Sequence, residues 1–129
     1  MSNFTCFLID DDDDDQEILR TVIDTVAPTW KCFSAMNGQT ALEMLQSQRV
    51  VPDIVFLDLN MPLMNGHQFL QEVNKLKILQ SVPIIVLTTS ADPSTKAAVL
   101  ELGARLFITK PDKFSDWETA LKQVIDNCL

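Results

Sequence analysis

Four of the short apolar runs in this sequence lead directly into side chains that can do chemistry. Asp10 and Asp11 follow the first run, and Asp58 follows the third. The fourth run leads to Thr88 and the fifth to Lys110. If these runs are neighbouring parallel strands, their carboxyl ends meet at one edge of a sheet, where ligands bind in this class of fold. We therefore expect the five side chains to lie close together.

The chemistry of such a group is that of phosphoryl transfer. Three neighbouring carboxylates repel one another and raise at least one carboxyl pKa, and a divalent cation relieves that repulsion. Mg²⁺ prefers oxygen ligands and often binds through one or two carboxylates together with a phosphate. A lysine supplies positive charge to phosphate oxygens, and a threonine hydroxyl donates a hydrogen bond to them. A carboxylate nucleophile beside a metal completes the set.

The elements that must position these residues alternate between two kinds of segment. Short runs with consecutive apolar residues, typical of buried parallel strands, cover residues 4–9, 30–34, 54–57, 84–87 and 106–108. Apolar residues at helical spacing lie between and after them: Ile18, Val22 and Val26; Ala41 and Leu45; Phe69, Val73 and Leu76; residues 97–102; Trp117, Leu121, Val124 and Cys128. Gly103 is a plausible end of the fourth helix. The pattern predicts a doubly wound α/β domain over residues 1–129.

Four stretches of the chain resemble the receiver domains of bacterial response regulators. They are residues 7–11 (FLIDD), 57–66 (LDLNMPLMNG), 82–88 (VPIIVLT) and 107–111 (FITKP). The second stretch is specific by itself, with an Asp-x-x-Met-Pro-x-Met-x-Gly pattern. A Thr follows its Asp by 30 residues and a Lys-Pro follows the Thr by 22. The resemblance covers the whole chain and implies a flavodoxin-like, five-stranded parallel sheet of order 2-1-3-4-5 with five helices.

The resemblance also implies a role for each matching residue. Asp58 would accept a phosphoryl group from a phosphohistidine on a histidine kinase or a histidine phosphotransfer protein. Asp11 would bind Mg²⁺ directly and Asp10 partly through water, with the backbone carbonyl of Asn60 as a further ligand. The metal ligands would thus be Asp10, Asp11, Asp58 and Asn60.

Further residues would sense and reset the phosphorylated state. Thr88 and Lys110 would contact the phosphoryl oxygens, and Thr88 and Phe107 would be the switch residues. Asn60, with Thr89 or Ser90, would line the path of the attacking water. The Lys-Pro bond of the family is usually cis, which a sequence alone cannot show. Core packing explains Phe107 equally well, and many relatives carry Tyr there.

The six consecutive aspartates from Asp10 to Asp15 leave the register of the metal site open. Asp13, Asp14 and Asp15 are well placed to cap the first helix and to oppose its dipole. Asp10 and Asp11 follow the strand directly, so we expect the metal there, whereas a slip of one residue would bring in Asp12. His67 has no second His or Cys nearby and is expected to be an ordinary surface or capping residue.

Composition excludes several other functions. The net charge of −8 argues against a nucleic-acid surface, which needs clustered Lys and Arg. There is no apolar run long enough to span a bilayer and no basic stretch before an apolar segment, so we expect a cytoplasmic protein. The three widely spaced cysteines form neither a CxxC pair nor a zinc pattern and are expected to be reduced packing residues.

Several alternatives follow from the same residues. The expected protein is a single-domain, non-enzymatic switch without an output domain. It is expected to have intrinsic self-phosphorylation and autodephosphorylation. It would either dock a protein partner or pass the phosphoryl group on as a relay. A haloacid-dehalogenase-like phosphatase would need a second Asp in place of Asn60. A flavin carrier would need small residues where the aspartates lie. A receiver that works without phosphorylation usually lacks one of the five site residues. The kinase, the target and the oligomeric state stay open.

Overall fold

The computed structural model describes residues 4–89 and 92–129, and within them strands and helices alternate along the whole chain. The strands are β1 (Thr5–Ile9), β2 (Lys31–Ala35), β3 (Ile54–Leu57), β4 (Ile84–Thr88) and β5 (Leu106–Thr109). The helices are α1 (Asp13–Val26), α2 (Gly38–Gln46), α3 (Gly66–Lys75), α4 (Pro93–Glu101) and α5 (Phe114–Cys128). Among the described residues, no helix is both long and apolar enough to cross a bilayer.

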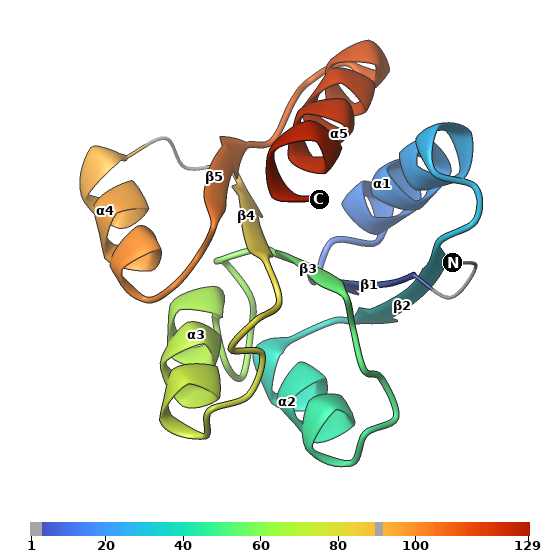
Figure 1. The fold of residues 1–129 in the computed structure, drawn as a ribbon. Helices are drawn as coiled ribbons and strands as arrows, with labels where there is room; N and C mark the ends of the chain where they lie inside the picture. The colour runs from blue at the N-terminus through green and yellow to red at the C-terminus, as the bar shows by residue number, and fades with distance from the viewer. Residues whose placement is uncertain (1–3, 90–91) are drawn as a thin grey trace.

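The strands form one parallel sheet in the order β2-β1-β3-β4-β5, which confirms the predicted fold class. β1, β3 and β4 lie inside the sheet and are almost entirely buried, because helices cover both of their faces. In Figure 1, α1 and α5 lie together on one side of the sheet, and α2, α3 and α4 lie on the other.

Two hydrophobic cores follow from the alternation of side chains along the strands. Phe7, Ile9 and Leu57 point towards the α2–α3 side, whereas Leu8 and Phe56 point towards the α1–α5 side. The second core is closed by Trp117, Leu121 and Val124 of α5. Burial of these apolar surfaces on both sides fixes the sheet between its helices, and so fixes where each strand ends.

α4 is longer than its apolar pattern predicts. The predicted helix covers residues 97–102, but the helix begins at Pro93, where Asp92 caps it through the backbone N–H of Ser94. The start is therefore set by a cap and an N-terminal proline, signals that apolar spacing does not contain. Gly103 follows the C-terminal cap with a φ of 103°, as expected for a residue that ends a helix.

Candidate metal and phosphoryl-transfer site

Three carboxylates meet at the carboxyl end of the sheet. Asp10 and Asp11 follow β1, Asp58 follows β3, and one carboxylate oxygen from each lies within 4.8 Å of the others. Asp58 is buried and Asp11 exposed, so the cluster runs from the interior to the solvent. The backbone N–H of Asp58 donates to the carbonyl oxygen of Ile9 at 2.9 Å, which ties the ends of the two strands together.

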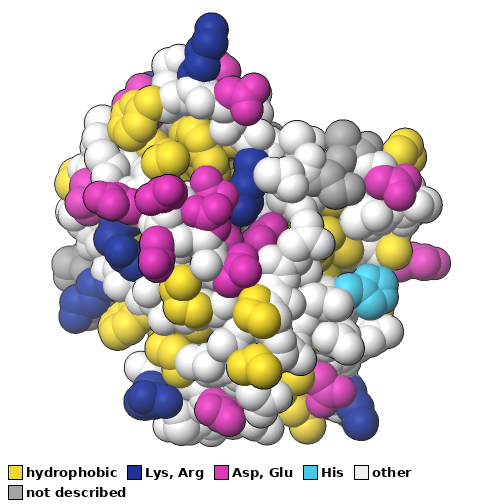
Figure 2. Space-filling model, turned by 180° about the vertical axis from the view of Figure 1, so that it is seen from behind, with side chains coloured by type: hydrophobic (Ala, Val, Ile, Leu, Met, Phe, Trp, Pro, Cys, Tyr) yellow, Lys and Arg dark blue, Asp and Glu magenta, His cyan; other side chains and the backbone are white. Residues whose placement is uncertain are grey.

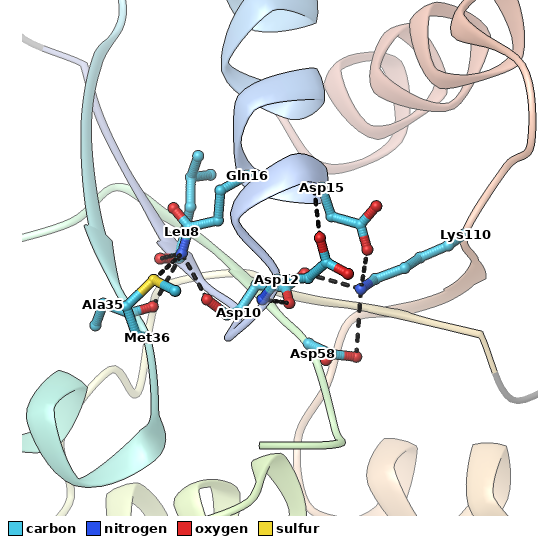
Figure 3. A network of polar contacts seen from close by, with 9 residues as sticks. All are labelled: Leu8, Asp10, Asp12, Asp15, Gln16, Ala35, Met36, Asp58 and Lys110. Atoms are coloured by element: carbon cyan, nitrogen blue, oxygen red, sulfur yellow. Dashed lines mark hydrogen bonds and ion pairs between the residues drawn. The ribbon is translucent and has the colours of Figure 1, made fainter. Parts of the chain in front are cut away.

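Lys110, at the end of β5, faces this cluster with its ammonium group (Figure 3). Its Nζ lies 2.9 Å from Asp10 Oδ2 and 3.7 Å from Asp58 Oδ1. The carboxylate of Asp15, in the first turn of α1 and outside this cluster, lies closer still, with its Oδ2 2.7 Å from Nζ. The side chain of Lys110 is only 8 % exposed, so its charge is directed at the carboxylates rather than at water.

Two carboxyl groups of the site have raised pKa values, mainly because they are buried and in smaller part because of neighbouring carboxylates. Burial and the neighbouring Asp10 raise the pKa of Asp58 to about 6, although Lys110 acts in the opposite direction. Burial also raises the pKa of Asp10, against its hydrogen bond with Lys110. Burial alone would lower the pKa of Lys110, but its hydrogen bonds to Asp15 and Asp10 outweigh this and raise it. The lysine is therefore charged, and the Asp58 carboxyl takes up a proton at a higher pH than an ordinary aspartate does.

Thr88 ends β4 with a buried hydroxyl group. Its side chain is fully buried, and its Oγ1 has no hydrogen-bond partner among the described residues. Such a group is unfavourable unless something else satisfies it. Thr88 also lines a surface pocket together with Asn60 and His67. His67 lies in the first turn of α3, whose cap is Asn65, so His67 is not the capping residue.

Phe107 lies on β5 opposite Val86 of β4. It is half-buried and packs against the core on the α2–α3 side. The structure thus places it next to the strand that ends in Thr88, and core packing accounts for its position. Of the residues expected to line the water path, Asn60 and Thr89 are exposed, and Ser90 lies outside the described residues.

The run of aspartates divides between strand end, helix cap and helix. Asp12 is the N-cap of α1 and its side chain accepts from the backbone N–H of Asp15, so the expectation that Asp13, Asp14 or Asp15 caps the helix is wrong. The N-cap is the residue just before the first helical residue, which is Asp13. Its side chain accepts from a backbone N–H two or three residues later in the chain, here that of Asp15. Asp13, Asp14 and Asp15 form the acidic first turn, as predicted.

Gln16 orients the acidic loop and was not predicted as a site residue. Its buried side-chain amide donates to the carbonyl oxygens of Asp10 at 2.7 Å and of Ala35 at 3.0 Å (Figure 3). It therefore joins the ends of β1 and β2 to the start of α1. The available signal was its helical spacing with Leu19 and Ile23, both of which face the core.

The loop after Asp58 is held against the start of α3. The backbone N–H of Gly66 donates to the carbonyl oxygen of Leu59 at 3.0 Å. A Cβ on Gly66 would clash with the backbone carbonyl oxygen of Asp58, so only glycine allows this approach. Asn65 and Gln68 form a capping box that starts α3 beside the loop.

Comparison with known proteins shows the family. A model of the response regulator receiver domain matches residues 6–122. The chain belongs to this family. It is 34% identical over 97% of its length to a protein-glutamate methylesterase/protein-glutamine glutaminase of Treponema pallidum, and covers 31% of that protein. It is 34% identical over 90% of its length to the probable C4-dicarboxylate response regulator DctR of Bacillus subtilis, and covers 50% of it. The chain thus spans half or less of these two curated relatives.

Solved structures show the same receiver fold. The Mn²⁺-bound form of response regulator Rcp1 has a TM-score of 0.85 at 24% identity, over 96% of this chain and 93% of that one. The chemotaxis response regulator CheY4 of Vibrio cholerae has a TM-score of 0.78 at 24% identity, over 94% and 98% of the two chains. The chain is therefore a receiver domain of two-component signalling by family, and a flavodoxin-like sheet by fold.

The bond between Lys110 and Pro111 is trans, unlike the bond that is usual in the family, and the described residues contain no cis peptide bond. The backbone N–H of Lys110 donates to the carbonyl oxygen of Thr88 at 2.8 Å, so the ladder between β4 and β5 extends to this residue. Its side chain reaches the acidic cluster from that position with the following bond in trans.

The acidic character of the receiver domain is partly local. Figure 2 shows Asp and Glu side chains gathered on one face of the molecule around a Lys or Arg side chain. With 18 acidic and 10 basic residues, the chain has a net charge of −8. The run from Asp10 to Asp15 supplies a third of the acidic residues of the chain.

Proposed function

We propose that this receiver domain is a phosphorylation switch that accepts a phosphoryl group on Asp58 from a phosphohistidine of a partner histidine kinase, in a Mg²⁺-dependent reaction. One observation carries the proposal. The buried Asp58 carboxylate shares a cluster with two further carboxylates and faces a buried lysine ammonium group 3.7 Å away. A carboxylate in that environment has both a place for a cation and a positive partner for a transferred phosphoryl group.

The donor atoms fit a hard divalent cation. Asp10, Asp11 and Asp58 supply carboxylate oxygens within 4.8 Å of one another, and burial, together with the neighbouring carboxylates, raises the pKa values of Asp10 and Asp58. Asp10, Asp11, Asp58 and the carbonyl of Asn60 would hold Mg²⁺. When bound, the ion would supply charge neutralisation between the acceptor and the incoming phosphoryl group.

The protein's own residues account for the transfer itself. An oxygen of the ionised Asp58 carboxylate attacks phosphorus, the P–N bond of the donor breaks, and the leaving imidazole takes up a proton. Lys110 then lies beside the charge on the phosphoryl oxygens. Thr88 offers a buried hydroxyl group with no partner among the described residues, and a phosphoryl oxygen would satisfy it.

The response would spread from Thr88 to the α4–β5 face. Thr88 ends the strand that pairs with β5, and Phe107 is half-buried on β5. Val99 is the one residue of α4 that is fully buried, so this helix is lightly held. Movement of Thr88 towards the phosphoryl group and a new rotamer of Phe107 would change the shape of this face, which would then dock a protein partner.

The test is phosphorylation by a small-molecule donor. The protein is incubated with acetyl phosphate and Mg²⁺, and its intact mass is followed beside an Asp58→Asn variant. We expect a single phosphoryl adduct that hydroxylamine removes and that is absent without Mg²⁺ and in the variant. A receiver that accepts a phosphoryl group only from its own kinase would give no adduct with acetyl phosphate. Beryllofluoride binding, followed by NMR, is therefore measured as a second test. Absence of both the adduct and beryllofluoride binding would contradict the proposal.

A further inference from the structure

Lys110 makes one contact that the predicted site does not contain, an ion pair with Asp15. These residues lie 95 positions apart in the chain, yet their side chains make the shortest of the three ion pairs of Lys110. Asp10 and Asp58 belong to the carboxylate cluster, whereas Asp15 belongs to α1 and is not part of that cluster. The lysine on which phosphoryl binding would depend is therefore shared with a carboxylate outside the metal site.

The position of Asp15 is fixed by the local fold. Its backbone N–H donates to the N-cap side chain of Asp12 at 3.0 Å, and the next residue, Gln16, is anchored to the ends of β1 and β2. The helix start therefore presents the Asp15 carboxylate to Lys110 from a rigid backbone. The Asp15 side chain is 24 % exposed, so its charge is only partly screened by water.

We propose that Asp15 is a positioning residue that competes with the phosphoryl group for Lys110. Before phosphorylation it holds the ammonium group at 2.7 Å, while the acceptor Asp58 is left at 3.7 Å. A phosphoryl group on Asp58 must draw Lys110 away from Asp15 or share it. Asp15 thus slows entry of the phosphoryl group and weakens the hold of Lys110 on it once it is bound. This inference rests on the proposed function.

The variant that tests it is Asp15→Asn, with Asp14→Asn as the matched control. Asp14 is its neighbour in the same turn, is exposed and carries the same charge, but makes no ion pair with Lys110. With acetyl phosphate and Mg²⁺, we expect Asp15→Asn to be phosphorylated about two- to fivefold faster than the wild type, the effect of one partly screened ion pair. Its autodephosphorylation should slow by a similar factor. Asp14→Asn should stay close to the wild type in both rates, and Asp15→Glu should move both rates back towards it.

A spectroscopic measurement reports the contact independently of phosphorylation. A buried, hydrogen-bonded ammonium group exchanges its protons slowly, so the ¹⁵Nζ resonance of Lys110 should be observable in the unphosphorylated protein. We expect Asp15→Asn to shift it and Asp14→Asn to leave it in place.

The outcomes separate the two proposals. If the wild type is phosphorylated but Asp15→Asn matches Asp14→Asn in both rates, the role of Asp15 is overturned and the proposed function stands. If the wild type takes up neither a phosphoryl group nor beryllofluoride, both proposals fall.

Discussion

At the scale of single residues, the site is defined by one cation among four carboxylates. Lys110 contacts three of them, and Asp11 completes the cluster towards the solvent. One positive charge does not balance this group, and burial together with the neighbouring carboxylates raises the pKa of Asp58 and of Asp10. The same residues that would hold a divalent cation are therefore expected to make the metal-free protein less stable at neutral pH.

The first prediction concerns the stability of the metal-free protein when Asp58 is replaced by Asn. The pKa of Asp58 rises from 3.8 to about 6, which corresponds to about 3 kcal/mol of differential interaction. Because the folded pKa is the higher one, the carboxyl contributes most to stability below pH 3.8, and this contribution is lost as pH rises through 6. Asp58→Asn should therefore raise the free energy of unfolding by about 1–3 kcal/mol at pH 7.5 and change it little near pH 4.

Urea denaturation in the presence of a chelator measures this difference. Asp112→Asn, which removes one exposed charge from a loop, is the control and should stay close to the wild type in its free energy of unfolding at pH 7.5. An Asp58→Asn variant that is less stable than the wild type at pH 7.5 would contradict the pKa argument.

At the scale of the elements, the site depends on where strands end and where α1 begins. The end of β1 supplies Asp10, the end of β3 supplies Asp58 and the end of β5 supplies Lys110, and the sheet alone brings these together. Gln16 adds the connection to α1, because its amide donates to backbone carbonyls of both β1 and β2 segments. The Gln16 side chain thus ties the start of the acidic loop, at Asp10, to the first turn of α1.

The second prediction tests that connection with Gln16→Met, which keeps the length of the side chain and removes the donor. The carbonyl oxygens of Asp10 and Ala35 would lose their side-chain partner in a buried position, which costs about 1–3 kcal/mol of stability. We also expect weaker Mg²⁺ binding, because Asp10 is no longer held. Thermal denaturation and a Mg²⁺ titration measure the two effects.

Gln71→Met is the matched control, since Gln71 is exposed on α3, away from this loop. It should leave both stability and Mg²⁺ affinity near those of the wild type. Equal behaviour of the two variants would show that the Gln16 amide does not hold the loop.

At the scale of the whole molecule, cation binding should be coupled to folding. The three carboxylates come from two segments that only the folded sheet brings together, so the unfolded chain has no equivalent site. A ligand that binds only the folded state stabilises it in proportion to the logarithm of its concentration.

The third prediction is that Mg²⁺ raises the free energy of unfolding, by about 2.7 kcal/mol at a concentration 100-fold above its dissociation constant. The gain should shrink as pH falls below about 6, because protons then compete for Asp58. Asp11→Asn should lose most of the gain, and Asp14→Asn should keep it. Denaturation at several Mg²⁺ concentrations measures the effect, and an equal gain in Asp11→Asn and the wild type would place the cation elsewhere.

Much of this arrangement could be predicted from the sequence because strand ends are local signals. Consecutive apolar residues mark the buried strands, and the topology of a parallel sheet then brings Asp10, Asp58, Thr88 and Lys110 to one edge. The N-terminal cap and the contact of Asp15 with Lys110 were not predictable in the same way. They depend on how α1 turns back over the sheet, and six identical side chains in a row give no pattern that distinguishes one from another.

The most direct test of the central claim is to locate the phosphoryl group after treatment with acetyl phosphate and Mg²⁺. Borohydride reduces an aspartyl phosphate to homoserine, and peptide mass spectrometry then identifies the position. We predict homoserine at position 58 and aspartate at positions 10 to 15. Homoserine at one of the aspartates of the run, with Asp58 unchanged, would contradict the assignment of Asp58 as the phosphoacceptor.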